Sequence, residues 1–236
     1  KVAAIVWGLN PLVALFAVGG GHNDVLMLLF STLGIYLILR ARQGLGGAVM
    51  IAAAAIKLTG ALLVPFALAS RPSRSEAGRA RRRTLVGVAI ATTAIATGSY
   101  LCFGGGLLNL PDTLQRVQSS GRLQSVPGIL LTVLGQCERR WLAVRLDALL
   151  AVVFCVWLLS RVWRGRIDWL DGAGWATTAL LVSAGALLPW YVCWLIPICA
   201  LTRDRRLREA AVWMTGIGVT IGVAGLMPHG LSMLRP

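Results

Sequence analysis

The sequence predicts an all-α, polytopic membrane protein, and two observations lead to this prediction. The first is composition: 57% of the 236 residues are hydrophobic, only 14% are charged, and the mean hydropathy is +0.74. A soluble domain with a polar exterior is far less apolar. The second is that the apolar residues form long runs without strand-like alternation. Because lipid offers the backbone no hydrogen-bond partners, such runs cross a bilayer as helices.

Seven apolar runs come close to the roughly 20 residues that a membrane-spanning helix requires. They cover residues 2–18, 25–39, 45–70, 84–103, 144–160, 174–202 and 209–227. The simplest interpretation is seven single crossings. For two of the runs, the distribution of positive charge argues against it.

Run 45–70 has arginines before it and an arginine cluster in residues 71–83 after it, and run 174–202 is likewise basic on both sides. One crossing would place a basic cluster outside, against the tendency of Lys and Arg to stay in the cytoplasm. Both runs are also interrupted near the middle, at Lys57–Gly60 and at Leu188–Tyr191. We therefore predict two hairpins of short helices, whose tips end inside protein or in a wet cavity. One long tilted helix per run is the alternative.

With two hairpins, residues 1–236 form a single transmembrane domain whose basic groups gather on the cytoplasmic side. Residues 71–83 are then a basic cytoplasmic loop, and residues 104–143 an extracytoplasmic segment on the side of the hairpin tips. The predicted location is the plasma membrane, with several crossings. Because the chain enters an apolar run directly from Lys1, we interpret it as the C-terminal portion of a larger protein.

The net charge of +14 is explained by this topology and does not indicate nucleic-acid binding. The basic residues lie in short clusters between apolar runs, and no motif that reads bases accompanies them. The sequence also lacks a Walker loop, a dinucleotide fingerprint, a nucleophile elbow and paired metal ligands. We therefore predict a bilayer-embedded protein with no nucleic-acid partner, no metal site and no cofactor.

The first candidate site is the glycine-rich turn from Gly19 to Asp24, between two apolar runs. His22 and Asp24 can together act as acid and base or position a hydroxyl group, which makes them candidate catalytic residues. Asn23 between them is a candidate substrate-binding residue. The alternative is structural, because Asn23 or Asp24 is also well placed to cap the following helix.

The second candidate is Lys57, which lies inside an apolar run. A lysine at the centre of a membrane helix costs about 2.5–3.5 kcal/mol on insertion scales, so it is a functional candidate by default. We predict that its ammonium binds a phosphate, in which case Lys57→Met would preserve the fold. The alternative is a lysine that reaches the interface or pairs with a carboxylate.

Aromatic and basic residues supply the remaining candidates for substrate binding. Trp190 and Tyr191 stand at the second interruption, where aromatic faces could line a sugar site, or could instead form the interfacial belt usual for these residues. Arg116 and Arg122 lie in the polar segment 104–143 and could bind an anionic headgroup.

Several short motifs resemble those of the actinobacterial polyprenol-phosphomannose-dependent α-1,6-mannosyltransferases, which are membrane glycosyltransferases of the GT-C class. The motifs are Asn10-Pro11-Leu12, Gly19 to Asp24, Lys57-Leu58-Thr59, Pro65-Phe66, Pro189-Trp190-Tyr191, Trp194 and Pro197. Their order and rough spacing agree over almost the whole chain. The resemblance implies a GT-C-like helical bundle.

The resemblance also implies a function. The donor would be mannose or a similar sugar on polyprenyl phosphate, and the acceptor a glycolipid or lipoglycan such as the lipomannan core of the cell envelope. Transfer would occur on the extracytoplasmic face, with inversion at the sugar carbon and without an obligatory metal. The family's catalytic acidic residue is expected upstream of Lys1. A transporter or lipid flippase with a broken-helix binding site is the alternative function, and a purely structural membrane subunit is a third.

Overall fold

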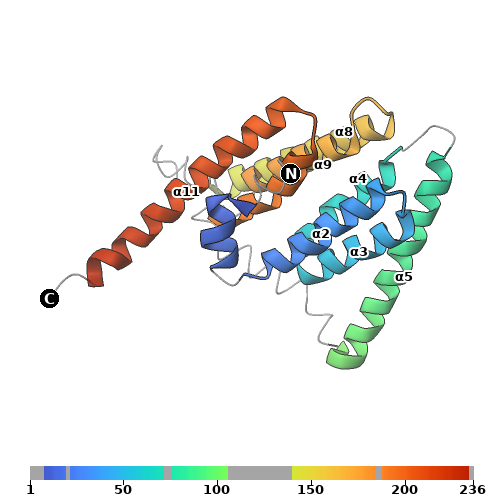
Figure 1. Ribbon diagram of the computed structural model, residues 1–236, viewed down its shortest axis with the longest axis horizontal. Helices are drawn as coiled ribbons and strands as arrows, with labels where there is room; N and C mark the ends of the chain where they lie inside the picture. Colours follow the sequence, from blue (N-terminus) through green and yellow to red (C-terminus); the bar gives the residue numbers. More distant parts are fainter. Residues whose placement is uncertain (1–7, 20–21, 72–75, 106–139, 184–187, 234–236) are drawn as a thin grey trace.

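The computed structural model describes residues 8–19, 22–71, 76–105, 140–183 and 188–233, where all regular secondary structure is helical and there is no strand (Figure 1). The helices are η1 Val13–Val18, α2 Asp24–Leu39, α3 Gln43–Ile56, η2 Leu58–Leu62, α4 Leu63–Ala69, α5 Ala77–Phe103, α8 Arg140–Trp163, α9 Trp169–Ser183, η5 Pro189–Trp194, α10 Ile196–Leu201 and α11 Arg205–Met233. The prediction of an all-α fold is therefore confirmed.

Two of the described helices are long and apolar enough to cross a membrane. They are α5 and, within α8, Arg145–Trp163. Beyond Gly87, no residue of α5 is buried inside the protein, and side chains such as Ile90, Leu101 and Phe103 are exposed. Water would make so much uncovered apolar surface very costly, whereas lipid covers it. The chain is an all-α membrane protein.

The α3–α4 segment is a hairpin, as the charge pattern predicts. Lys57 ends α3 in an extended conformation (φ −151°, ψ 122°). The chain then turns back, so that a Cβ atom on Gly60 would lie only 3.0 Å from the carbonyl carbon of Ala53 in α3. At the other end of the hairpin, the Leu68 carbonyl accepts a hydrogen bond from Arg81 Nε at 3.2 Å. The Thr84 hydroxyl of α5 contacts Gln43 Oε1 at the start of α3 at 3.4 Å, so both outer ends lie at the basic beginning of α5.

The α9–α10 segment folds back in the same way. Near its outer ends, the Thr202 hydroxyl donates to Asp171, and the Trp175 indole N–H donates to Asp204 Oδ2 at 2.8 Å. Partial burial acts to raise the pKa of Asp204, but the hydrogen bond from Trp175 and others from backbone amides outweigh it and lower the pKa. The beginning of α9 and the end of α10 are therefore held together on one side of the molecule.

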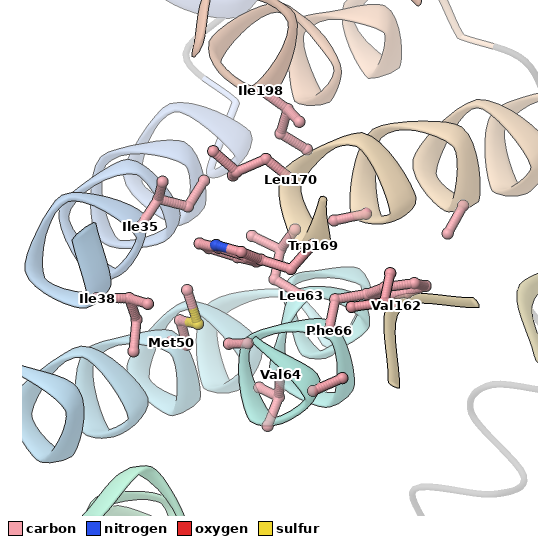
Figure 2. Packing of buried hydrophobic residues seen from close by; sticks show 14 of the residues in the cluster. Ile35, Ile38, Met50, Leu63, Val64, Phe66, Val162, Trp169, Leu170 and Ile198 are labelled. Carbon is pink, nitrogen blue, oxygen red and sulfur yellow. The ribbon is translucent and has the colours of Figure 1, made fainter. Parts of the chain in front are cut away.

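Two clusters of buried apolar side chains hold the hairpins against α2 and α8. Figure 2 shows the second cluster, in which the Trp169 indole projects from α9 toward Ile35 of α2 and Met50 of α3. Phe66 of α4 is 1% exposed and packs in the same cluster. This cluster fixes the two hairpins relative to each other, and so fixes where their tips meet.

Parts of two predicted connecting segments are helical instead. The predicted loop 71–83 becomes helix from Ala77, because Ala and Arg are strong helix formers and continue α5 beyond its apolar part. At 27 residues, α5 is about 40 Å long, which exceeds the roughly 30 Å hydrocarbon core. The predicted segment 104–143 likewise ends early, because α8 begins at Arg140.

Helices α3 and α5 are in backbone contact at Gly44 and Gly87. A Cβ atom on Gly87 would lie 1.8 Å from the Gly44 carbonyl oxygen, so Gly87→Ala forces the helices apart. We expect this substitution to lower the free energy of unfolding by about 1–3 kcal/mol, measured by denaturation in mixed micelles. The matched control is Gly98→Ala on the same helix, where a Cβ atom would have nothing within 4 Å. Equal stability of the two variants would contradict the close approach.

Candidate functional site

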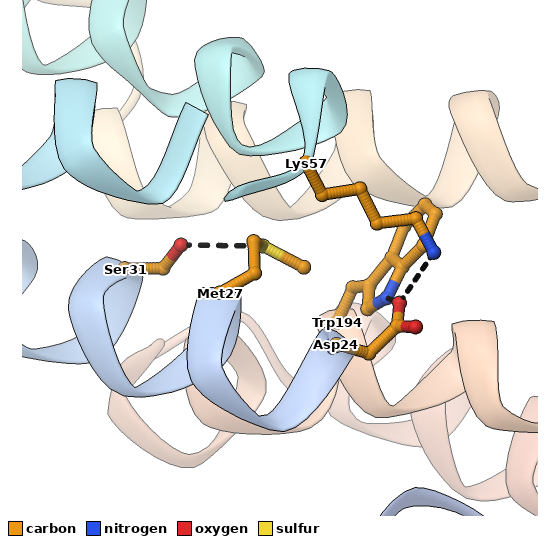
Figure 3. A network of polar contacts seen from close by, with 5 residues as sticks. All are labelled: Asp24, Met27, Ser31, Lys57 and Trp194. Atoms are coloured by element: carbon orange, nitrogen blue, oxygen red, sulfur yellow. Dashed lines mark hydrogen bonds and ion pairs between the residues drawn. The ribbon is translucent and has the colours of Figure 1, made fainter. Parts of the chain in front are cut away.

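The tips of the two hairpins meet beside the beginning of α2. Lys57 comes from the break between α3 and η2, Asp24 is the first residue of α2, and Trp194 is the last residue of η5 (Figure 3). Asp24 and Trp194 are 170 positions apart in the sequence. The three side chains nevertheless form one polar cluster, which we call the tip cluster.

The Asp24 carboxylate is the centre of the tip cluster. Its Oδ1 accepts a hydrogen bond from Lys57 Nζ at 2.7 Å and another from Trp194 Nε1 at 2.5 Å. Asp24 is 1% exposed, whereas the Lys57 side chain keeps 22% of its surface. A carboxylate this deeply buried needs a cation and hydrogen-bond donors to offset the lost hydration. Lys57 and Trp194 supply both.

Asp24 is therefore not a side-chain cap of α2. Asn23 occupies the N-cap position, but neither residue makes the capping hydrogen bond that the sequence allowed. The carboxylate is directed to the tips of the hairpins instead. Its place in the first turn of α2 adds the favourable field of a helix N-terminus.

Two aromatic rings surround the Lys57 ammonium. Its Nζ lies 4.4 Å from the ring centroid of Tyr191 and 4.8 Å from that of Trp194. Both distances are within the range of cation–π attraction. Lys57 thus pairs with a carboxylate, the structural alternative that the sequence left open, and remains partly accessible. An accessible ammonium can still bind an anion.

The aromatic residues form a continuous wall from the rim of the site to the tip cluster. His22 stacks on Trp190 with centroids 4.0 Å apart and an interplanar angle of 16°. Trp190 meets Tyr191 edge-on at 6.0 Å, and Tyr191 lies 4.4 Å from Trp194. The structure thereby brings together the predicted residues His22, Asp24, Lys57, Trp190 and Tyr191.

The other predicted site residues are Asn23, Arg116 and Arg122. Asn23 is exposed at the rim, beside His22. Arg116 and Arg122 lie outside the described residues. Sequence reasoning did not assign Trp194 to the site, although it noted the residue in a motif. Its spacing of three from Tyr191 is the available signal, because residues three apart share one side of a short helix.

Asn10 lies outside the site and stabilises the segment that packs against it. Its Oδ1 accepts a hydrogen bond from the backbone N–H of Leu12 at 2.9 Å, and its Nδ2 contacts the Thr215 hydroxyl of α11 at 3.4 Å. Leu12 is fully buried between α11 and η5, where a Cβ atom on Gly218 would lie 3.0 Å from it. The Asn10-Pro11-Leu12 motif therefore supports the helix that carries Trp190 and Tyr191.

A narrow pocket of about 30 Å³ lies behind the tip cluster, between α2, η2, α9 and α10. Its lining is mainly apolar and includes Met27, Leu63 and Trp194. Thr59 also lines it, and the Thr59 hydroxyl is buried without a hydrogen-bond partner among the described residues. This volume suits a water molecule and is too small for a sugar.

Two protein-family models match the chain. "Alpha-(1->6)-mannopyranosyltransferase, N-terminal domain" matches residues 1–71, and "MptB C-terminal domain" matches residues 120–236. The chain belongs to the alpha-(1->6)-mannopyranosyltransferase family. The family predicted from the sequence motifs is thereby confirmed. Asp24 and Lys57 fall in the first matched region and Tyr191 and Trp194 in the second, so the tip cluster is assembled from both.

Two curated relatives are similar over most of this chain. Alpha-(1->6)-mannopyranosyltransferase A of Mycobacterium tuberculosis is 25% identical over 224 residues, which cover 86% of this chain and 42% of the relative. Alpha-(1->6)-mannopyranosyltransferase B of Corynebacterium glutamicum is 25% identical over 255 residues, covering 95% and 42%. The chain thus spans about two fifths of the length of these relatives. No solved structure matches it.

Proposed function

We propose that the chain forms the donor-binding part of a membrane mannosyltransferase of the GT-C class. The enzyme transfers mannose from a polyprenyl-phosphate carrier to a glycolipid or lipoglycan of the cell envelope, on the extracytoplasmic face of the plasma membrane. The names of the relatives support the mannosyl group and the transfer. The observation that carries the proposed donor site is the Lys57 ammonium, which is partly exposed where the two hairpin tips meet.

The charge and surroundings of Lys57 suit a lipid phosphate. The donor is an anion confined to the membrane, so its site needs a cation held at depth. Asp24 is well suited to hold that cation, because its Oδ1 binds Lys57 and the carboxylate itself is almost inaccessible. We assign Asp24 the role of positioning Lys57 rather than that of reacting with substrate.

The chemistry follows from this arrangement. The bond between the sugar carbon and the phosphate oxygen breaks, and its electron pair stays on the phosphate, where Lys57 stabilises the growing charge. The acceptor oxygen bonds to the same carbon and loses its proton to a base. Among the predicted residues, His22 is half-buried at the rim and can orient that hydroxyl or take its proton.

The aromatic wall is proposed to hold the sugar. The faces of Trp190 and Tyr191 offer apolar surface with a polar edge, which matches the mixed faces of a pyranose ring. Asn23 lies close enough along the chain to bind a sugar hydroxyl at the rim. Arg116 and Arg122 remain candidates for binding an anionic group of donor or acceptor.

The donor class can be tested with the purified protein at the full length of its relatives, reconstituted in vesicles. We expect radiolabelled mannose to pass from mannosyl-phosphopolyprenol to a lipid acceptor, and not from a nucleotide sugar. Transfer from a nucleotide sugar without a lipid intermediate would contradict the proposed donor. Movement of the intact lipid across the vesicle, without transfer, would support a flippase instead.

A further inference from the structure

A groove between α3 and α5 joins a basic end to an apolar track. It encloses about 710 Å³ on the surface of the protein. Three arginines stand at one end, Arg42 before α3 and Arg82 and Arg83 in α5. Leu45, Val86 and Ile90 line the rest, which we call the apolar track, and each is at least half exposed.

The shape of the groove follows from glycine. Because Gly44 and Gly87 bring the two backbones together, the floor is shallow and the neighbouring side chains stand as walls. Arg82, Val86 and Ile90 follow one another at intervals of four, so they share one face of α5. The face runs eight residues from charge to hydrocarbon, a length of about 12 Å at 1.5 Å per residue.

The three arginines lack an anionic protein partner among the described residues. The two ion pairs found there are Lys57–Asp24 and Arg205–Glu209. Arg42, Arg82 and Arg83 are all exposed at the groove. Their positive charge therefore lies next to an apolar surface that is itself uncovered, and a ligand that satisfies both is an anion with a hydrocarbon tail.

We propose that this groove binds one anionic phospholipid from the bilayer. Its phosphate lies among the guanidinium groups of Arg42, Arg82 and Arg83, which suit phosphate oxygens geometrically. One acyl chain follows Leu45, Val86 and Ile90. The lipid braces the beginning of α3, the helix whose other end carries Lys57. It is a separate site from the tip cluster and does not depend on the proposed transferase activity.

The test is a native mass spectrometry titration of the purified chain in detergent with phosphatidylglycerol or phosphatidylcholine. We expect one phosphatidylglycerol to bind more tightly than phosphatidylcholine. Arg82→Gln with Arg83→Gln should weaken it on the order of 25-fold, since each basic residue near the surface contributes about fivefold. Val86→Trp fills the track, keeps the charges and should also weaken binding. Inorganic phosphate should not compete.

The matched control is Arg164→Gln with Arg166→Gln. These exposed arginines line a second, more polar pocket at the same end of the molecule, beside Arg71. We expect the control to bind phosphatidylglycerol within about twofold of the unmodified chain. An equal loss in both double variants, equal binding of the two lipids, unchanged binding by Val86→Trp, or competition by inorganic phosphate would each overturn the proposal.

Discussion

Lys57→Met is expected to lower the free energy of unfolding by about 3 kcal/mol or more, because it removes the cation from a buried ion pair. The Asp24 carboxylate is 1% exposed and would keep only the hydrogen bond from Trp194 among its two described donors. It cannot reach water without opening the contact between the hairpin tips. The measurement is denaturation of the purified chain in mixed micelles.

The stability of two further variants provides a comparison for the loss expected in Lys57→Met. Asp24→Asn should destabilise the protein less, because Lys57 keeps a fifth of its side-chain surface and two aromatic rings when the carboxylate is lost. Combining Asp24→Asn with Lys57→Met removes both charges and should recover stability to within about 1.5 kcal/mol of the unmodified protein. Additive losses in the double variant would show that the ion pair contributes nothing.

This expectation reverses the one drawn from the sequence. An isolated lysine in an apolar run costs energy to bury, so the sequence predicts that methionine would preserve the fold. The structure places the Asp24 carboxylate 2.7 Å from the ammonium. Replacing Lys57 therefore leaves a buried carboxylate without its cation, which lowers the free energy of unfolding. Nothing local in the sequence links Asp24 with Lys57, because they are 33 residues apart and meet only through tertiary packing.

The hairpins could be predicted because the side of the membrane on which a segment lies depends on its total positive charge and not on individual contacts. Arginines flank both long apolar runs, and each run has an internal break, so the fold back was visible without knowing any contact. The sequence did not show where in the basic segment 71–83 the helix begins. Arginine is a good helix former as well as a loop residue, and α5 therefore extends back to Ala77.

The site was predicted as residue types and not as an arrangement. Lys57, Trp190 and Tyr191 stood out because polar or aromatic residues interrupt apolar runs. The hydrogen bond from Trp194 to Asp24 spans 170 residues and has no counterpart in sequence periodicity. The same holds for Asn10, which contacts Thr215 across 205 residues and stabilises the site from a distance.

Donor binding by the neutral double variant, Asp24→Asn with Lys57→Met, tests the central claim most directly. The measurement is the dissociation constant of mannosyl-phosphopolyprenol for the protein at the full length of its relatives, with unfolding followed in parallel. A lost charge-assisted phosphate contact is worth about 1.5–3 kcal/mol, so we predict 10- to 150-fold weaker binding by a folded protein. Arg166→Gln at the opposite end, as control, should leave the constant unchanged. An unchanged constant in the folded double variant would contradict the assignment of Lys57 as the phosphate-binding residue.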